Sequence, residues 1–356
     1  MMKPTVTVLI DTYNHERFIE EAIVSVLEQD FPRDDMEILV VDDGSTDRTP
    51  EIVRKFEPRV RLLRKANGGQ ASAFNAGIPE CQGEIIAFLD GDDWWVPLKL
   101  RMVVAQLEAN PEVGAVGHGL YESYSDVRPP RSVVTERACR VHLSDPATAR
   151  LFTQLRACLG TSRITIRRTL LEQILPFPEQ LVIEADEWMF TLAPALAPVV
   201  VLNQPLVFYR LHDGNLYQFS NADRAKARRK RAVLEVLLQL LPLRLRELGV
   251  SDEVIATVVE PIWVDAERIR LWLGGGKPWQ TFRVERASYR YRYHHSHVTF
   301  GCRLFNAMVL ALALALPPCL FYRLRQWYSD NNLRKLRRIV GEPSTDAPIL
   351  EQRPEP

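Results

Sequence analysis

The sequence predicts an α/β fold, in which a mainly parallel sheet carries helices on both faces and a helical region follows. Two observations support this prediction. Short apolar runs alternate with segments of helical periodicity over residues 1–95, and the connections between them are short. In addition, each polar cluster in this part of the chain follows an apolar run, at the point where a buried strand would end.

The elements of the first half follow from these runs in order. Residues 6–10 and 37–41 are rich in Val, Ile and Leu and predict buried strands, and the apolar spacing over 17–29 predicts a helix between them. The next expected elements are a helix over 49–56, a strand over 60–63, a helix over 71–78 and a strand over 83–89.

The second half of this domain has a weaker pattern. Its expected elements are a helix over 98–108, one or two strands over 113–124, a helix over 147–155, a strand over 162–166, a helix over 184–196 and last strands over 199–202 and 206–209. Residues 125–145 are polar and contain Pro129 and Pro130, which predicts a mobile loop.

From residue 224 onward the sequence becomes helical and basic. Residues 224–338 contain 22 Lys and Arg but 9 Asp and Glu, although the net charge of the whole chain is zero, so the two parts are expected to meet different partners. We therefore expect a first domain over 1–220, a basic helical region over 221–340 and a disordered, Pro- and Glu-rich tail over 341–356.

The strongest chemical signal is Asp90-Gly91-Asp92-Asp93, directly after the apolar run 85–89. Ionised carboxylates this close repel one another and need a cation. Mg²⁺ and Mn²⁺ prefer oxygen ligands, and such ions commonly hold substrate phosphates as well. The segment predicts an enzyme that acts on a phosphate ester through a metal, although a surface turn is the simpler interpretation of this motif alone.

Three further polar clusters fall at predicted strand ends: Thr12-Tyr13-Asn14, residues 42–47 and residues 67–77. Together with residues 90–93 they resemble the family-2 glycosyltransferases of the GT-A fold. The resemblance is dense over residues 1–95 and extends more loosely to Asn215. It implies an inverting, metal-dependent transfer of a sugar from a nucleotide diphosphate sugar to a hydroxyl of a glycan or lipid-linked acceptor.

The resemblance assigns roles in the donor site by position. Asp43 corresponds to the aspartate that binds the nucleotide base and Tyr13 to the aromatic residue beside it, with UDP favoured because Asp43 fits uracil. Asp90 and Asp92 match the ends of the Asp-x-Asp motif, which contacts the ribose and an Mn²⁺ or Mg²⁺ ion. Asp93 and His212 complete the metal candidates, and the other expected donor-binding residues are Thr12, Asn14, Asn67, Gly69, Gln70, Asn75, Gly91 and Arg210.

An inverting transfer also needs a base that removes the proton of the acceptor hydroxyl. The spacing before Tyr209-Arg210 in the family points to Asp186, but Ala185 replaces the usual preceding Glu. The base therefore stays open among Asp186, Glu184 and Glu187, and a solvated helix face is the competing interpretation. Two other departures are Asp11, where the family often has Pro, and Phe74, where many members have a basic residue.

The C-terminal region raises the question of membrane contact. The apolar segment 307–322 is interrupted by Pro317-Pro318 and is short of the ~20 residues that a spanning helix needs. Arg303 precedes it, and Arg323, Trp327 and several further basic residues follow. This composition favours monotopic attachment to an anionic membrane over a soluble helical domain. The region contains no recognised nucleic-acid-binding motif, so nucleic acid is not expected as a partner.

The cellular location expected from sequence is cytoplasmic, peripheral or monotopic at the inner face of the plasma membrane. The five cysteines form no Cys-x-x-Cys pair, which favours a reducing compartment, and the N-terminus enters a strand pattern without a signal peptide. Two rival functions remain. One is a catalytically degenerate nucleotide-sugar-binding scaffold in glycan assembly, and the other is a sugar nucleotidyltransferase, which would normally show a basic Gly-rich loop after the first strand.

Overall fold

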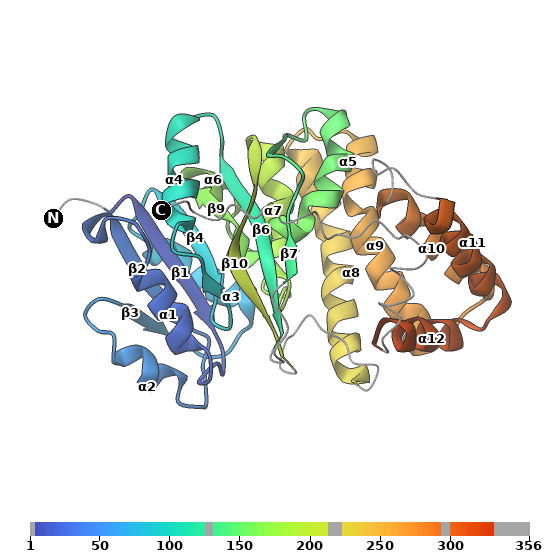
Figure 1. Ribbon diagram of the computed structural model, residues 1–356, viewed down its shortest axis with the longest axis horizontal. Coiled ribbons are helices and arrows are strands. Elements are labelled where there is room, and N and C mark those ends of the chain that lie inside the picture. The colour runs from blue at the N-terminus through green and yellow to red at the C-terminus, as the bar shows by residue number, and fades with distance from the viewer. Residues whose placement is uncertain (1–3, 125–130, 213–222, 293–299, 331–356) are drawn as a thin grey trace, which may run out of the picture. The chain divides into compact units, whose positions relative to one another are not determined.

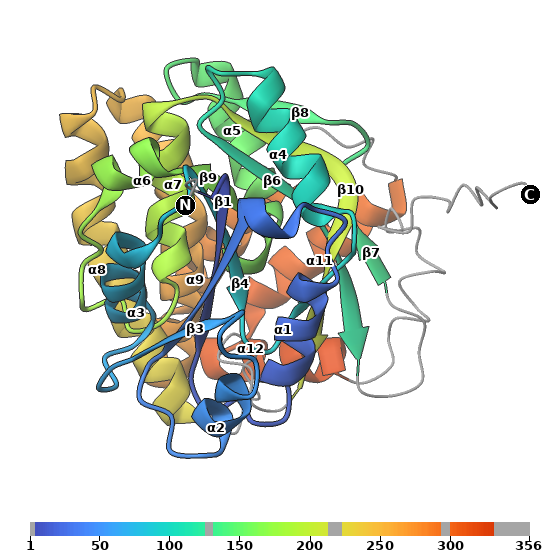
Figure 2. The same ribbon diagram turned by 90° about the vertical axis from the view of Figure 1, so that its left-hand side faces the viewer.

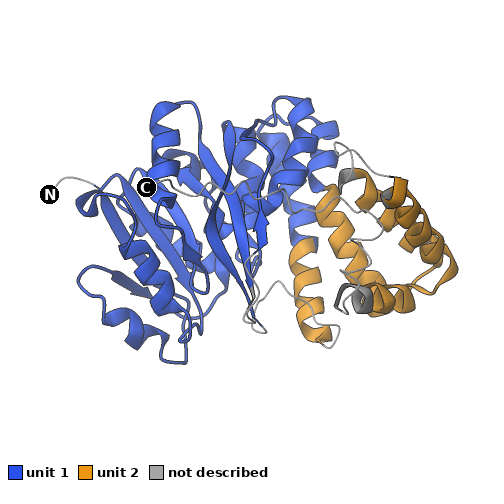
Figure 3. Cartoon of the chain, viewed as in Figure 1, with its two compact units in different colours: residues 1–217, 235–259 blue, residues 218–234, 260–356 orange. Residues whose placement is uncertain are grey.

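The structure is a computed structural model that describes residues 4–124, 131–212, 223–292 and 300–330 (Figure 1). The chain divides into two compact units (Figure 3). The first comprises residues 1–217 and 235–259, and the second comprises residues 218–234 and 260–356.

Within the described residues, the first unit is built on a 10-stranded sheet in the order β3-β2-β1-β4-β9-β6-β10-β5, with β7 beside β6 and β8 beside β10. The strands are β1 (Val6–Thr12), β2 (Met36–Asp42), β3 (Arg61–Arg64), β4 (Ile85–Asp90), β5 (Trp94–Trp95), β6 (Ala115–Tyr124), β7 (Arg131–Val133), β8 (Cys139–Val141), β9 (Thr165–Arg167) and β10 (Val199–Leu211). Strand β1 runs parallel to β2 and β4, β2 to β3, and β6 to β10, whereas β9 lies antiparallel between β4 and β6. The predicted α/β architecture is confirmed.

Helices cover both faces of this sheet (Figure 2). The α-helices up to β10 are α1 (Ile19–Leu27), α2 (Thr49–Arg54), α3 (Gln70–Gly77), α4 (Lys99–Ala109), α5 (Pro146–Leu155), α6 (Arg168–Ile174) and α7 (Ala185–Leu196). The buried faces of α1 and α4 pack on one side, against Val8, Ile38 and Ala87. On the other side α3 approaches closely, because a Cβ at Gly77 would lie 2.5 Å from Val41 Cγ2.

Two predictions for the second half of this unit were wrong. Residues 131–133 and 139–141 form β7 and β8 within the expected loop, whose first part, 125–130, lies outside the described residues. These strands of 3 residues are too short to show periodicity. The two last strands are instead one strand, β10, which continues through Pro205 because its register against β6 shifts on both sides of that residue.

The helices after β10 are α8 (Arg224–Glu247), α9 (Asp252–Gly274), α10 (Pro278–Arg292), α11 (Phe300–Ala315) and α12 (Pro318–Asp330). The sequence predicted one boundary after residue 220, but residues 235–259 belong to the first unit. There Leu237, Leu241 and Leu245 are buried at helical spacing. The two units divide within α8 and within α9. Because each helix continues across its division, the helical pattern of the sequence does not reveal these boundaries.

The second unit has its own apolar core. It contains Val264, Leu271, Val284, Ala287, Ala313, Phe321 and Tyr322. Glu285 is buried beside this core and pairs with Arg268 and Arg325, which lower its pKa against the opposing effect of burial. Among the described helices, none is both long and apolar enough to cross a membrane. The predicted tail, 341–356, lies outside the described residues.

Candidate active site

The polar clusters of the sequence meet at one edge of the sheet. Thr12, Asp42 and Asp90 are the last residues of β1, β2 and β4. Because these strands are parallel neighbours, their carboxyl ends lie on the same edge, where open α/β sheets bind ligands. Residues 67–69, which precede α3 and are called here the glycine loop, reach the same edge because they form hydrogen bonds with Asp43.

Asp43 holds the glycine loop in place. Its carboxylate accepts hydrogen bonds from Lys65 Nζ at 2.7 Å, from the Gly68 amide at 3.0 Å and from the Gly69 amide at 2.7 Å. The Asn67 side chain donates to the Asp43 carbonyl at 3.0 Å. Gly69 has a φ of 86°, and a Cβ there would lie 2.5 Å from Val182 Cα, so this position requires glycine. The predicted base-binding residue is therefore rigidly placed.

The first turn is fixed to the end of β2. Asn14 has a left-handed φ of 57°, and its Oδ1 accepts a hydrogen bond from the Thr46 amide at 2.8 Å. The Asn14 amide donates to Ser45 Oγ at 2.8 Å. Thr12 Oγ1 lies 3.2 Å from His15 Nδ1, while Tyr13 is exposed. Of these residues, Tyr13 has the accessible aromatic ring that a base-stacking role needs.

Carboxylates crowd the end of β4. Asp11 faces Asp90 across β1 and β4, and Asp92 and Asp93 follow within the next turn. Burial and the neighbouring Asp92 charge raise the pKa of Asp11 to about 8 and that of Asp93 to about 7. Burial and the charges of Asp11 and Asp93 raise the pKa of Asp90 well above its usual range. These three carboxyls therefore keep their protons to a higher pH than an isolated aspartate does.

Asp92 differs from the other carboxylates because two histidines approach it. His212 Nε2 lies 3.1 Å from Asp92 Oδ2, and His15 Nε2 lies 3.9 Å from the same atom. Burial opposes ionisation of Asp92, but the hydrogen bond from His212 and the nearby His15 hold its pKa below the usual range. Asp92 is thus the carboxylate of this cluster that stays ionised most readily.

The residues present fit a divalent cation that is bound largely by the substrate. Asp11 Oδ1 and Asp93 Oδ2 are buried without a hydrogen-bond partner in the described part of the chain. Within that part, no group of three or more His, Cys, Asp and Glu side chains is arranged to hold a metal by itself. Mg²⁺ is typically held by one or two carboxylates together with phosphate oxygens, so an incomplete protein cage agrees with such a site.

Asp186 is connected to the start of α3 through Thr161 and Gln70. The buried Asp186 carboxylate accepts a hydrogen bond from the Thr161 amide at 3.2 Å. Gln70 Nε2 donates to Thr161 Oγ1 at 3.1 Å, and Gln70 Oε1 accepts from the Ala185 amide at 2.9 Å. The Gln70 amide thus links α3 to the start of α7. Glu184, at a left-handed φ of 57°, precedes that helix.

Glu187 has a structural partner. Arg156 donates to both of its carboxylate oxygens, and Thr191 Oγ1 donates at 3.2 Å. Burial raises the pKa of Glu187, and the Arg156 charge opposes this shift. A carboxylate held in a bidentate pair with Arg is poorly suited to accept a substrate proton. The geometry therefore favours Asp186 over Glu187 as the base.

Arg210 is held by hydrogen bonds against residues 90–93, which we call the acidic turn. Its amide donates to Asp93 Oδ1 at 2.9 Å, and its Nε donates to the Asp92 carbonyl at 2.8 Å. Its guanidinium pairs with Glu21 and lies 4.4 Å from the Trp94 ring centroid. Arg210 therefore shapes the turn that carries Asp92. Residues 213–215 of the predicted closing loop lie outside the described residues.

Two residues that sequence reasoning associated with the donor have partners elsewhere. Asn75 exchanges two hydrogen bonds of 2.8 Å with the backbone of Phe177. Phe74 is fully buried and contacts Phe88 and Phe177 edge to face. Position 74 therefore belongs to the core, which explains why it carries no basic residue. A contact between Asn75 and the donor stays a prediction.

Sequence reasoning missed Ser162 and Thr161. Ser162 Oγ donates to Asp90 Oδ2 at 3.1 Å and accepts from the Asp90 amide at 3.1 Å, and Trp95 Nε1 donates to the Ser162 carbonyl at 3.0 Å. Thr161 contacts Asp186 as described above. No motif marks these positions, because β9 brings this segment beside β4 from far along the chain.

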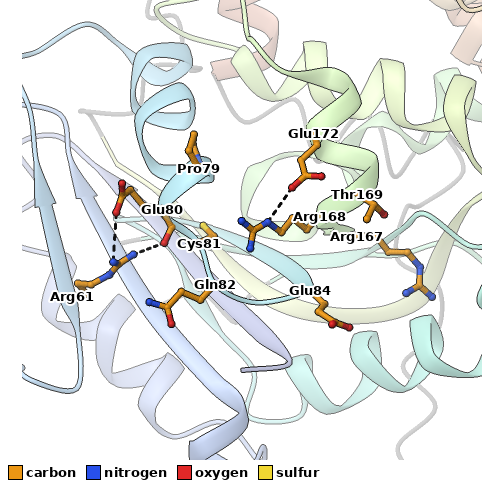
Figure 4. Close-up of a pocket in the computed structure, with 10 residues that line it drawn as sticks. All are labelled: Arg61, Pro79, Glu80, Cys81, Gln82, Glu84, Arg167, Arg168, Thr169 and Glu172. Carbon is orange, nitrogen blue, oxygen red and sulfur yellow. Dashed lines mark hydrogen bonds and ion pairs between the residues drawn. The ribbon is translucent and has the colours of Figure 1, made fainter. Parts of the chain in front are cut away.

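A hollow of about 1020 Å³ lies away from this edge, where Arg61 begins β3 and Arg167 ends the antiparallel β9 (Figure 4). Arg61 pairs with Glu37 and Glu80, and Arg168 pairs with Glu172. Arg167 donates to the carbonyls of Val113 and Leu107. The hollow contains none of the predicted site residues, and its arginines are committed to these partners.

Comparison with known proteins identifies a family over the residues that contain the four polar clusters. The model of the family described as glycosyl transferase family 2 matches residues 7–175. A glycosyltransferase of Nostoc sp. is 33% identical over 217 residues, which cover 59% of this chain and 66% of the relative. EpsJ, a glycosyltransferase of Bacillus subtilis, is 39% identical over 130 residues, covering 36% and 37%.

Poly(ribitol-phosphate) beta-N-acetylglucosaminyltransferase TarS of Staphylococcus aureus is 29% identical over 216 residues, covering 57% of this chain and 35% of TarS. The chain thus spans between about a third and two thirds of the length of these relatives. The crystal structure of TarS 1–349 with UDP-GlcNAc has a TM-score of 0.51 at 21% identity and covers 92% of each chain. The structure with UDP has the same TM-score at 22% identity and covers 92% of this chain and 93% of the other. These similarities show a shared fold.

Proposed function

Because this chain belongs to glycosyl transferase family 2, we propose that it transfers a sugar, with inversion, from a nucleotide diphosphate sugar to a hydroxyl of a glycan or lipid-linked acceptor. The observation that carries the proposal is that Asp43, the glycine loop and the acidic turn with Asp92 lie at the same edge of the sheet. A base-binding carboxylate and a diphosphate-binding acidic turn are the two parts that a nucleotide-sugar donor site requires.

The donor is proposed to be a UDP-sugar. Asp43 Oδ2 accepts from the backbone of the glycine loop, and a carboxyl oxygen has a second lone pair that can accept from a base N–H as well. Tyr13 supplies an exposed ring at the same edge. TarS was crystallised with UDP and UDP-GlcNAc, which supports testing UDP-sugars first.

Asp92 and Asp90 are the proposed ligands of an Mn²⁺ or Mg²⁺ ion, with Asp93 and His212 as further candidates. When bound, the ion stabilises the charge that develops on the diphosphate leaving group. Asp92 contributes the ionised carboxylate, Ser162 orients Asp90, and Arg210 fixes the turn between them.

Asp186 is the proposed base. The Thr161 amide orients its carboxylate, and Gln70 ties this arrangement to the start of α3. A base placed by the same residues that place the donor would keep the acceptor oxygen and the sugar carbon in a fixed relation. Glu184, one residue before α7, is the alternative.

The proposed place of action is the cytoplasmic face of a membrane, in keeping with a lipid-linked acceptor. The basic composition after residue 224 and the apolar segment 307–322 support this location.

Release of UDP from UDP-GlcNAc in the presence of Mn²⁺ tests the proposal. We expect the wild type and the control variant Asp30→Asn, whose substituted side chain is exposed, to release UDP at equal rates. Asp92→Asn should lower the rate by about a hundredfold or more, since it removes the ionised ligand. Equal rates for Asp92→Asn and wild type would contradict the metal-site assignment.

The same experiment separates the two rival functions. A nucleotide-sugar-binding scaffold would bind the donor and release no UDP, with or without candidate acceptors. A sugar nucleotidyltransferase would form pyrophosphate from a nucleoside triphosphate and a sugar phosphate, and would not release UDP from UDP-GlcNAc.

A further inference from the structure

Helix α11 has one side that packs within the second unit. Val309, Ala313 and the following Leu316 lie on this side and contact the core of the unit. Their spacing of 4 and 3 residues is that of one helix face. The core accounts for the apolar residues on this side only.

The opposite side of α11 is also apolar, but it is exposed. Phe300, Leu304, Met308 and Leu312 follow one another at every fourth position and are 82%, 61%, 50% and 42% exposed. Exposed alanines lie between them, and Arg303 is the single charged residue of the helix. An apolar stripe therefore runs along the exposed side of α11.

Helix α12, which follows α11 in the chain, also exposes apolar side chains. Leu320 and Leu324 are exposed, whereas Phe321 and Tyr322 on the inner side are buried in the core. Among the residues that the structure describes, seven of the eleven exposed large hydrophobic side chains lie between 300 and 324. Soluble proteins seldom expose so many apolar side chains together unless another surface covers them. We name the exposed residues of α11 and α12 the apolar face.

The charged residues in the stretch of sequence that contains the apolar face have one sign. From Arg286 to Ser329 the sequence contains no Asp or Glu and six Arg. Arg303 is adjacent to Leu304, Arg323 is adjacent to Leu324, and both arginine side chains are exposed. An apolar surface bordered by arginines complements an anionic lipid leaflet, in which acyl chains and phosphates lie at neighbouring depths.

The dimensions favour a position in the plane of the leaflet. Helix α11 has 16 residues and ends before Pro317. At 1.5 Å per residue it is about 24 Å long, which is less than the ~30 Å hydrocarbon core of a bilayer. Its opposite side is committed to the protein core, so only one side is available to lipid.

Two other occupants of the apolar face can be considered. In a symmetric pair of chains, Arg303 and Arg323 of one copy would approach those of the other, and this stretch offers no acidic residue to neutralise them. The second candidate is segment 331–356 of this chain. It contains five Lys and Arg and four Asp and Glu, so its side-chain net charge is close to zero and it offers the exposed arginines little electrostatic attraction.

We propose that the apolar face of α11 and α12 docks on the surface of an anionic lipid bilayer and holds the enzyme at the membrane without spanning it. This inference deepens the function proposed above, because it places the enzyme where a lipid-linked acceptor lies.

Co-sedimentation of the full chain with vesicles tests the proposal. One set of vesicles contains phosphatidylcholine alone, and the other contains phosphatidylcholine with phosphatidylglycerol. The test variant combines Leu304→Ser, Met308→Ser and Leu312→Ser. The matched control is Leu243→Ser in α8, because Leu243 is 55% exposed and lies outside the apolar face.

We expect the wild type and Leu243→Ser to bind the anionic vesicles, and to bind them less at high salt. The triple variant should bind about tenfold more weakly or worse, since each substitution removes apolar surface from the lipid contact. Arg303→Gln with Arg323→Gln should reduce the preference for phosphatidylglycerol. Equal binding of the triple variant and the wild type would overturn the proposal.

Three other results would overturn it. The first is a wild type that binds neither kind of vesicle. The second is a wild type that forms a dimer in solution which the triple substitution dissociates, because the occupant would then be a second copy. The third is vesicle binding that appears only after removal of residues 331–356, because that segment would then be the occupant.

UDP release in the absence of vesicles is measured on the same samples. Equal release by wild type and triple variant shows that the variant is folded. Vesicle binding without UDP release from any variant would contradict the proposed function and leave the docking surface intact, so the two failures are distinguishable.

Discussion

Asp11 and Asp90 face each other on the neighbouring parallel strands β1 and β4, and the Gly91 amide donates to the Asp11 carbonyl at 2.9 Å. The side chain of Asp11 thereby adds a further carboxylate to the acidic turn, at a position where the family often has proline. Its Oδ1 is buried and lacks a hydrogen-bond partner among the described residues. This chain therefore places one more titratable carboxyl group at the candidate site than the resemblance implies.

The stability of the cation-free protein should depend on Asp11 through pH. Because the folded pKa of Asp11 is raised to about 8, the folded state keeps a proton that the unfolded state releases above pH ~4. Stability therefore falls as pH rises between these values. Urea unfolding without divalent ions should show a smaller fall for Asp11→Asn, by about 1–3 kcal/mol between pH 5 and 8. Parallel pH curves for both proteins would count against this account.

Asp186 and Glu187 should respond differently to loss of charge. Asp186→Asn is expected to lower the turnover number about a hundredfold or more and to leave donor binding nearly unchanged. Glu187→Gln should keep most of the turnover per folded molecule and lower the free energy of unfolding by about 2–4 kcal/mol, because the buried ion pair with Arg156 is lost. Steady-state kinetics and urea unfolding of both variants measure this. A greater loss of turnover in Glu187→Gln would reverse the assignment.

Gln70 should act on turnover through Asp186. Gln70→Ala removes the hydrogen bonds to Thr161 and to the Ala185 amide, so the base is held less firmly. We expect kcat to fall about tenfold to a hundredfold and the KM for the donor to change little. Gln70→Glu keeps the acceptor for Ala185 and should recover part of kcat. If the KM rises and kcat is unchanged, Gln70 contacts the donor directly, as the sequence resemblance predicted.

Lys99 should lower stability at neutral pH. It is fully buried, its Nζ donates to Thr165 Oγ1 at 2.9 Å, and burial lowers its pKa well below the usual range. The unfolded state therefore binds a proton that the folded state lacks, and stability should rise with pH up to about 10.4, the ordinary lysine value. Lys99→Met should be more stable than wild type at pH 7, with a difference that shrinks towards pH 10. A difference that is constant with pH would show that Lys99 is charged in the fold.

The edge of the sheet was predictable because its signals are local. Each motif directly follows its own strand, and parallel neighbours place their ends together. The partners of these motifs were not predictable in the same way. Ser162 reaches Asp90 only because β9 inserts antiparallel between β4 and β6, a pairing that no local pattern announces.

The sequence also could not predict which way individual side chains point. Asp186 and Glu187 are adjacent in the chain, yet one meets Thr161 and the other meets Arg156. The apolar segment 307–322 was evident from composition, but its division into a packed side and an exposed side depends on the helices that surround it.

The central claim is a metal-dependent nucleotide-sugar site at the Asp43–Asp92 edge. Thermal stabilisation of wild type and Asp92→Ala by UDP-, GDP-, dTDP- and CDP-sugars, with and without Mn²⁺, tests it most directly. We predict that UDP-sugars raise the Tm of the wild type only when Mn²⁺ is present, and that this increase disappears in Asp92→Ala. If no nucleotide sugar raises the wild-type Tm, or if Asp92→Ala is stabilised equally, the claim is contradicted.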